Sequence, residues 1–196
     1  MNIFANSVEK VKNLGTQDRR IRKTRAVLKS SLLSLMKEKS VKHITVKELC
    51  DKADINRGTF YLHYTDVFDM LEQIEDDMFN ELDEFLAPIE RQEDVFNEEL
   101  FRKVFIFVKN NNEFCQVMLS DRGEIAFTKK LIKFLHSKFT NHFGDTSTAE
   151  HYFSFMVFGV LGIIESWLNA GMKETPEEMA EICSNIIQNK IRDQLS

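Results

Sequence analysis

The segment from Asn56 to Tyr64 carries the side chains of this chain that are best suited to hydrogen-bond with a nucleic acid. It reads Asn-Arg-Gly-Thr-Phe-Tyr-Leu-His-Tyr. An arginine can donate two parallel hydrogen bonds to a guanine edge, and hydroxyl, amide and imidazole groups can bind base edges or phosphates. Gly58 has no side chain, so the backbone beside it could approach a ligand closely. This chemistry is recognition, and it needs a helix that carries the side chains into a groove.

Local signals upstream predict the elements that position this segment. Thr45 followed by Glu48 forms a capping-box pattern, in which the Thr hydroxyl accepts from the Glu48 amide and the Glu carboxylate reaches back to the Thr45 amide. Apolar residues then recur at spacings of three and four and predict one buried helix face. Asn56 is suited to cap a second helix, whose first turn holds Arg57, Gly58 and Thr59. Two short helices with a tight turn between them form a helix-turn-helix.

Residues 55–64, Ile-Asn-Arg-Gly-Thr-Phe-Tyr-Leu-His-Tyr, resemble the recognition-helix signature of the TetR/AcrR family of bacterial one-component transcriptional regulators. The resemblance is strong from about Asp18 to Leu82. It extends more weakly to the C-terminus, where residues 162–183 resemble the last two helices of family members. Many members place a lysine that touches phosphate at the start of the fourth helix, whereas this chain reads Thr65-Asp66-Val67. That contact is therefore not implied here.

The resemblance implies a set of DNA contacts. Thr45 would contact phosphate, Arg57 and Thr59 would contact bases or phosphates, and Tyr64 would be either a backbone contact or part of the core. Phe60 and Leu62 are expected to pack inside the protein. The full set of expected DNA-binding residues is Thr45, Lys47, Asn56, Arg57, Gly58, Thr59, Tyr61, His63 and Tyr64.

Charge is distributed unevenly along the chain. The 196 residues carry a net charge of −5, which by itself argues weakly against nucleic acid. However, residues 1–64 contain 14 Lys or Arg and 6 Asp or Glu, a balance of +8, whereas the remainder contains 12 and 25, a balance of −13. A basic N-terminal part could neutralise phosphates while the acidic remainder is repelled by them. The basic cluster Arg19 to Arg25 fits this interpretation, although a solvated charged face is the alternative.

The pattern of apolar residues predicts an all-α fold. Residues 1–17 are expected to form a flexible arm, residues 18–66 a helix-turn-helix domain, and residues 67–196 a helical effector-binding and dimerisation domain. Apolar positions from Val67 to Phe85 predict a long helix that joins the two domains. Further helices are expected at about 95–109, 113–119 and 124–143, with breaks at 90–94, 110–112, 120–123 and 144–145. A helix capped by Ser147 or Thr148 should end near Gly171, and Thr175-Pro176-Glu177-Glu178 should start a last helix through Ile191.

The last two helices are apolar enough to suggest a partner. Residues 152–164 are apolar almost all round, so a two-fold four-helix contact with a second copy would cover them, as in the family, and a monomeric core with a central helix is the alternative. The expected dimer contacts are Phe155, Phe158, Gly159, Gly162, Ile163, Trp167, Ile182 and Ile186. The resemblance also implies an effector site between the helices, with Phe105, Val108, Met118, Phe127, Leu131 and Phe155 as candidate lining residues.

Several function classes are disfavoured. No run of about 18 apolar residues and no secretory leader is apparent, so a cytoplasmic protein without a membrane segment is expected. The three cysteines are expected to be buried and reduced. The spacing of the histidines predicts no metal site. The sequence has no clear nucleophile-and-base arrangement and no Gly-rich phosphate loop, so neither a catalytic site nor a cofactor is expected. The predicted function is a homodimeric repressor that binds a palindromic operator in double-stranded DNA and is controlled by an unknown small-molecule or protein effector. An activator controlled by a partner protein, or a helical adaptor without DNA binding, are the alternatives.

Overall fold

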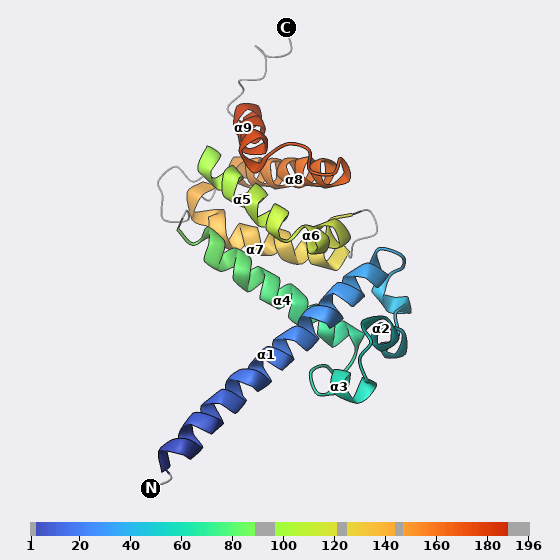
Figure 1. Ribbon diagram of the computed structural model, residues 1–196. Coiled ribbons are helices and arrows are strands. Elements are labelled where there is room, and N and C mark those ends of the chain that lie inside the picture. The colour runs from blue at the N-terminus through green and yellow to red at the C-terminus, as the bar shows by residue number, and fades with distance from the viewer. Residues whose placement is uncertain (1–2, 89–96, 121–124, 144–146, 188–196) are drawn as a thin grey trace. The chain divides into compact units, whose positions relative to one another are not determined.

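The computed structural model describes residues 3–88, 97–120, 125–143 and 147–187, and within these ranges every regular element is a helix (Figure 1). The expected breaks at 90–94 and 144–145, and the one at 120–123 except for Ser120, lie outside the described residues. The expected break at 110–112 is confirmed, since α5 ends at Asn110 and α6 begins at Asn112. The chain divides into two compact units, Met1–Ile74 and Glu75–Ser196. We call them the N-terminal unit and the C-terminal unit. The division falls inside helix α4 (Val67–Leu86), which therefore contributes residues to both.

The N-terminal unit contains α1 (Ile3–Met36), a short 3-10 helix η1 (Val41–His43), α2 (Val46–Ala53), α3 (Arg57–Tyr61) and the first part of α4. In place of the arm expected over residues 1–17, α1 begins at Ile3. This stretch contains no proline and a single glycine, so little in it opposes helix formation. The core of the unit is made by side chains with no solvent exposure: Leu28, Leu32, Leu49, Phe60 and Met70.

Side-chain caps set the starts of the two short helices. The Thr45 hydroxyl accepts from the Glu48 amide at 3.2 Å, as expected for α2. The second half of the expected capping box is different, because the Glu48 carboxylate accepts instead from Lys39 Nζ at 2.7 Å. This bond is the main cause that lowers the pKa of Glu48. Asp54 ends α2 in the left-handed conformation (φ 53°), which turns the chain toward α3.

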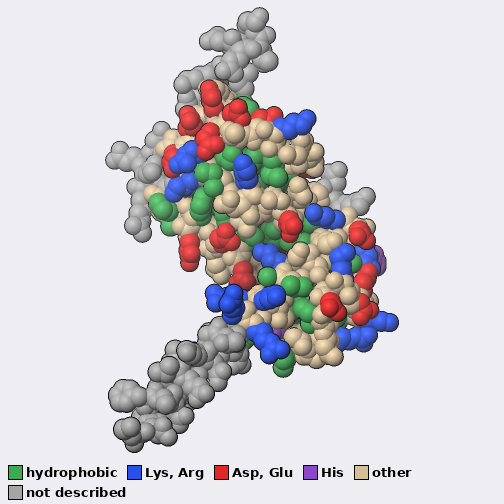
Figure 2. Space-filling model, viewed as in Figure 1, with side chains coloured by type: hydrophobic (Ala, Val, Ile, Leu, Met, Phe, Trp, Pro, Cys, Tyr) green, Lys and Arg blue, Asp and Glu red, His purple; other side chains and the backbone are tan. Residues whose placement is uncertain are grey.

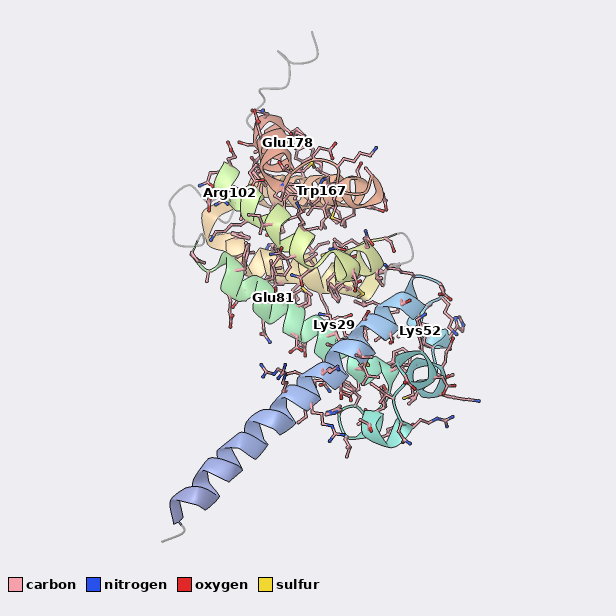
Figure 3. All side chains as sticks on the ribbon, in the orientation of Figure 1. Lys29, Lys52, Glu81, Arg102, Trp167 and Glu178 are labelled. Atoms are coloured by element: carbon pink, nitrogen blue, oxygen red, sulfur yellow. The ribbon has the colours of Figure 1, made fainter. Side chains whose placement is uncertain are left out.

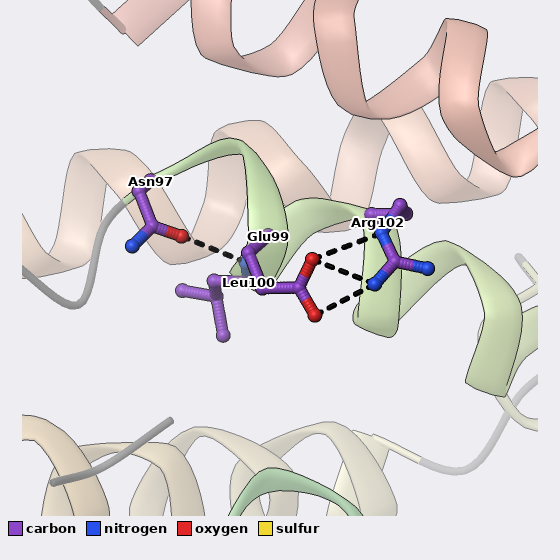
Figure 4. Close-up of polar contacts among 4 residues, drawn as sticks. All are labelled: Asn97, Glu99, Leu100 and Arg102. Carbon is purple, nitrogen blue, oxygen red and sulfur yellow. Dashed lines mark hydrogen bonds and ion pairs between the residues drawn. The ribbon is translucent and has the colours of Figure 1, made fainter. Parts of the chain in front are cut away.

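The C-terminal unit contains the second part of α4 with α5 (Glu98–Asn110), α6 (Asn112–Met118), α7 (Ile125–Phe143), α8 (Ser147–Asn169) and α9 (Pro176–Ile187). Helix α5 packs along α9, and α8 contacts α6 and α7. Asn97 caps α5 by accepting from the Leu100 amide at 3.1 Å, and the Arg102 guanidinium forks onto the Glu99 carboxylate (Figure 4). Glu99, helped by Glu177 at the start of α9, raises the pKa of Arg102.

The connection from α8 to α9 follows the sequence signals closely. Gly171 has φ 82°, and the Met172 amide donates to the Trp167 carbonyl at 2.9 Å, which closes the end of α8. Thr175 and Glu178 then form a complete capping box. The Thr175 amide donates to the Glu178 carboxylate at 2.7 Å, and the Glu178 amide donates to the Thr175 hydroxyl at 3.2 Å. Pro176 occupies the first helical position, where its missing amide hydrogen is not needed.

Helix α8 bears on the expectation that no apolar segment is long enough to span a membrane. Its segment Glu150–Asn169 has 20 residues and a mean hydropathy of 1.3, so by length and composition alone it could cross a membrane. The core helix of a soluble protein passes the same test. Here one face of α8, with Phe153, Met156 and Ile164, is buried within the C-terminal unit.

Candidate nucleic-acid interface

The exposed face of α3 carries three of the nine expected DNA contacts. Arg57, Gly58 and Tyr61 are exposed, and Thr59 and His63 are half-buried. Because successive residues of a helix are turned by about 100°, Gly58 lies at the centre of this face and Tyr61 beside it. Phe60 points the opposite way and is fully buried. The short helix thus presents one polar face to solvent and fixes the other in the core.

The two cap residues have part of their hydrogen-bonding capacity committed. The Asn56 side-chain oxygen accepts from the Gly58 amide at 2.7 Å, and the Thr45 hydroxyl oxygen accepts at the start of α2. The Asn56 amide group and the Thr45 hydroxyl hydrogen remain as donors for phosphate. Lys47, in the first turn of α2, is exposed. All three residues lie at the starts of the two short helices.

The structure favours one of the two alternatives for Tyr64 and corrects the expectation for Leu62. Tyr64 is only 5% exposed, so it is part of the core and not an exposed contact residue. Its ring lies 5.5 Å from that of Phe60, and the Arg25 guanidinium lies over it at 5.6 Å. Leu62, expected to pack inside, is instead 80% exposed. Sequence periodicity failed here because α3 has only five residues, too few to define which side is buried.

The segment Thr65-Asp66-Val67, which departs from the family pattern, forms the capped start of α4. Asp66 accepts from the Asp69 amide at 2.8 Å, and Asp69 accepts from the Thr65 amide at 2.7 Å. These bonds occupy the first turn, and the bond from Thr65 is the main cause that lowers the pKa of Asp69. Two carboxylates, those of Asp66 and Asp69, therefore lie at the start of this helix. The first turn of this helix is capped by its own side chains and would repel phosphate.

The N-terminal unit exposes several basic side chains on α1, η1 and α2. Arg19, Arg20, Arg22 and Lys23 on α1 are all exposed, and so are Lys42 and Lys52. Figure 2 shows Lys and Arg side chains gathered on the visible face of the N-terminal unit, and Lys52 is labelled on α2 in Figure 3. Such a surface can displace the counterions of a duplex.

The C-terminal unit contains a partly open cavity of about 130 Å³. Every lining side chain is apolar, and α4 to α8 all contribute. Val108, Phe127 and Leu131 line it, as expected. Lining residues that sequence reasoning did not name include Met78, Phe79, Leu82, Leu135, Phe139 and Met156.

The other three expected lining residues are elsewhere. Phe105 is fully buried, with its ring edge-on to Trp167 at 5.3 Å, and Met118 is buried outside the cavity lining. Phe155 is 71% exposed. A helical stripe marks all of these positions as apolar, but it does not say which of them border a void.

The outer face of α8 is an exposed apolar stripe. Phe155 and Phe158 are 71% and 58% exposed, and Gly159 and Gly162 lie beside them on the same face, where a Cβ added to either glycine would meet no atom within 4 Å. Ile182 and Ile186 of α9 are also exposed, and Ile163 is half-buried. Trp167, expected in the same contact, is only 2% exposed, because it packs into its own chain and donates to the Glu174 carbonyl at 3.1 Å (Figure 3). It therefore offers no surface to a partner.

The three cysteines are buried inside the protein. Cys50, Cys115 and Cys183 are free and buried, and burial raises the pKa of Cys183 to about 12. Burial also raises the pKa of Cys50. Among the described residues, no group of three His, Cys, Asp or Glu side chains is placed to hold a metal ion.

The described residues thus form a helical protein with a basic helix-turn-helix in one unit and an apolar cavity in the other, a combination typical of helix-turn-helix transcriptional regulators. Residues 97–189 match a TetR-type family described as the C-terminal region of transcriptional regulators. The chain is therefore similar to the TetR family of transcriptional regulators, most directly over this C-terminal region.

Individual relatives agree with this assignment. The HTH-type transcriptional regulator YxbF of Bacillus subtilis is 26% identical over 175 residues, which cover 84% of this chain and 45% of that protein. The chain thus spans about half the length of this relative. A TetR transcriptional regulator from Streptococcus agalactiae has a TM-score of 0.60 at 22% identity, and the match covers 89% of this chain and 98% of that one. The fatty acid degradation regulator FadR from Bacillus halodurans has a TM-score of 0.62 at 12% identity, with coverage of 83% and 93%. At these identities the solved structures establish the fold.

Proposed function

We propose that the protein is a cytoplasmic, non-enzymatic repressor whose homodimer binds a palindromic operator through α2 and α3 and leaves it when an apolar effector fills the cavity of the C-terminal unit. The observation that supports this proposal best is the set of side chains on the exposed face of α3. Arg57 and Tyr61 are held outward on a helix that Asn56 caps and Phe60 anchors. Arg57 would donate to a base edge, and Thr45 and Lys47 would contact phosphates.

Dimerisation would supply the DNA affinity that one short recognition helix lacks. A single recognition helix contacts only a few base pairs, and two half-sites about 34 Å apart add their contributions. The stripe with Phe155, Phe158 and the two glycines of α8 is suited to a two-fold contact with the same stripe on a second copy. Ile182 and Ile186 of α9 would extend that contact.

The cavity supports an uncharged, apolar effector. A charged group would lose its hydration inside a lining that offers no polar side chain in exchange. Apolar cavities of about 150 Å³ bind molecules the size of benzene, so a volume of about 130 Å³ suits a small hydrocarbon group. FadR of Bacillus subtilis was solved with stearoyl-CoA. In the present protein, the hydrocarbon part of such a ligand is the part that the lining would accept.

Helix α4 is the element through which the effector would act. It lines the cavity with Met78, Phe79 and Leu82, and its first half supplies Met70 and Leu71 to the core of the N-terminal unit. A coupling of about 1 to 3 kcal/mol between effector and operator would change occupancy roughly 5- to 150-fold.

The test is to select duplexes from a random-sequence pool with the full chain and to footprint the protein on DNA flanking its own gene. We expect a palindromic site, an affinity that falls steeply with salt, and lower expression of a reporter placed behind that site. If no duplex is enriched, or if binding does not depend on salt, the protein is an adaptor. If the reporter is activated, the sign of the proposed regulation is wrong.

A further inference from the structure

Leu62 is the most exposed of the large apolar side chains in the described part of the chain, at 80%. It follows the last residue of α3 and keeps a helical backbone conformation (φ −73°, ψ −17°), with its amide bonded to the Thr59 and Phe60 carbonyls. Its position is therefore fixed by the helix, while its side chain is left in water. Single exposed leucines are ordinary, so the surroundings of Leu62 decide whether this one has a role.

Leu62 lies on the face of α3 that is proposed to enter the major groove. It follows Gly58 by four residues, so the two lie one above the other on the helix surface, with Tyr61 on the other side of Gly58. A Cβ built on Gly58 would meet only the Asn56 side-chain oxygen, at 3.2 Å. The centre of the face is thus a shallow space next to an isobutyl group and an aromatic ring that is 57% exposed.

The groove offers one apolar group that this arrangement fits. Among the base edges in the major groove, only thymine presents an apolar substituent, its 5-methyl group, whereas the other positions present hydrogen-bond donors and acceptors. The neighbours Arg57, Thr59 and His63 can bind those polar positions. Leu62 cannot, and it would leave any polar group that it covers without a partner.

We propose that Leu62 determines specificity by packing against the 5-methyl group of one thymine in each operator half-site. The proposal rests on the binding of α3 in the major groove argued above. It assigns an apolar contact to a residue that sequence reasoning placed inside the protein. A protein partner that docks on Leu62 is the competing explanation.

The experiment uses the full chain and a duplex that it selects from a random pool. Each thymine is replaced in turn by deoxyuridine, which lacks only the methyl group and keeps the base pair and its hydrogen-bonding edge. We expect the affinity to fall about fourfold at one symmetry-related thymine per half-site, as for the loss of one buried methyl group. Leu62→Ala should lower the affinity for the thymine duplex by a similar or larger factor and should bind the thymine and deoxyuridine duplexes equally at that position.

Two control variants accompany it. Leu62→Met keeps an apolar side chain and should retain the discrimination between thymine and deoxyuridine. Ile125→Ala removes an apolar side chain that is 73% exposed in the C-terminal unit and should change neither duplex. Because Leu62 is exposed, Leu62→Ala should melt at the temperature of the unmodified chain.

The outcomes are distinguishable. If Leu62→Ala discriminates deoxyuridine as the unmodified protein does, or if it binds DNA normally and loses a protein partner instead, the inference is wrong and the proposed function stands. If the unmodified protein enriches no duplex at all, the proposed function fails, and the inference fails with it.

Discussion

Glu75 on α4 and Lys130 on α7 form an ion pair with an Oε2 to Nζ distance of 2.7 Å, in which the Glu75 side chain is only 7% exposed and that of Lys130 is 46% exposed. The pair belongs to a regular ladder between the two helices. Four residues further along each helix, Phe79 contacts Phe134 with ring centroids 5.4 Å apart. Another four residues along, Asp83 pairs with Lys138. The helices therefore run in the same direction here, beside the cavity that Phe79 lines.

Breaking the ion pair between Glu75 and Lys130 should destabilise the protein. Lys130→Met leaves the Glu75 carboxylate buried without its partner, which should cost about 1 to 3 kcal/mol in the free energy of unfolding. The cost is below that of a fully buried pair because Lys130 is partly solvated. Urea unfolding measures it, with Lys129→Met, at an exposed neighbouring position, as the control. Adding Glu75→Gln should recover part of the loss, and equal stabilities of the two lysine variants would contradict the assignment.

Arg57 and Lys47 should differ in their effect on DNA binding. Arg57→Ala should cost about 1 to 3 kcal/mol on the selected operator and relax specificity at one base pair, because a directed hydrogen bond is lost. Lys47→Ala should weaken binding to all sequences alike and reduce the salt slope by about one. Titrations of operator and random duplex at several salt concentrations separate the two. An Arg57→Ala variant with full affinity would remove Arg57 from the proposed interface.

Gly162→Leu should stabilise the single chain and weaken the dimer. A glycine within a helix is about 1 kcal/mol less favourable than alanine, and a Cβ at Gly162 meets no atom within 4 Å. The new side chain would, however, stand in the stripe with Phe155 and Phe158 that faces the partner in the proposed dimer. Sedimentation velocity measures the dimer, and Lys129→Leu controls for an added apolar side chain. A variant that dimerises as tightly as the unmodified chain would argue for another interface.

Filling the cavity should abolish effector binding. Benzene is a suitable probe for an apolar cavity of this size, and it should raise the melting temperature of the unmodified protein. Val108→Phe projects a larger side chain into the cavity and should remove this shift, at a cost of up to about 1 to 3 kcal/mol from overpacking. Ile125→Ala, a change away from the cavity lining, should retain the rise in melting temperature with benzene. A shift that survives in Val108→Phe would place the binding site elsewhere.

The thiols should be inert in the folded protein. With the pKa of Cys183 at about 12, its thiolate is scarce at pH 8, and burial raises the pKa of Cys50 as well. A chromogenic disulfide reagent at pH 8 should therefore react slowly with the native chain and rapidly with all three cysteines in denaturant. Rapid reaction of one thiol in the folded protein would contradict this prediction and would point to a redox role for that cysteine.

The elements that the sequence predicted correctly depend on short-range chemistry. Asn56 caps α3, Thr45 caps α2, and Thr175 with Glu178 starts α9, because each bond joins groups two or three residues apart in the chain. Gly171 takes the left-handed conformation at the end of α8 for the same local reason. The recognition-helix pattern and the basic N-terminal part likewise require no knowledge of distant contacts. The all-α prediction followed from apolar residues at helical spacing, and the resemblance to the TetR family followed from the recognition-helix pattern.

The tertiary structure decided which side of each helix is covered. Trp167 and Phe155 are both apolar residues of α8, yet the first is buried against Phe105 and the second is exposed, because neighbouring helices pack on only one side. The same selection buries Tyr64 and exposes Leu62 two residues earlier. It also decides that Val108 borders a void while Met118 is buried away from it. Apolar periodicity gives the orientation of side chains about their own helix axis, whereas burial depends on partners that are distant in sequence.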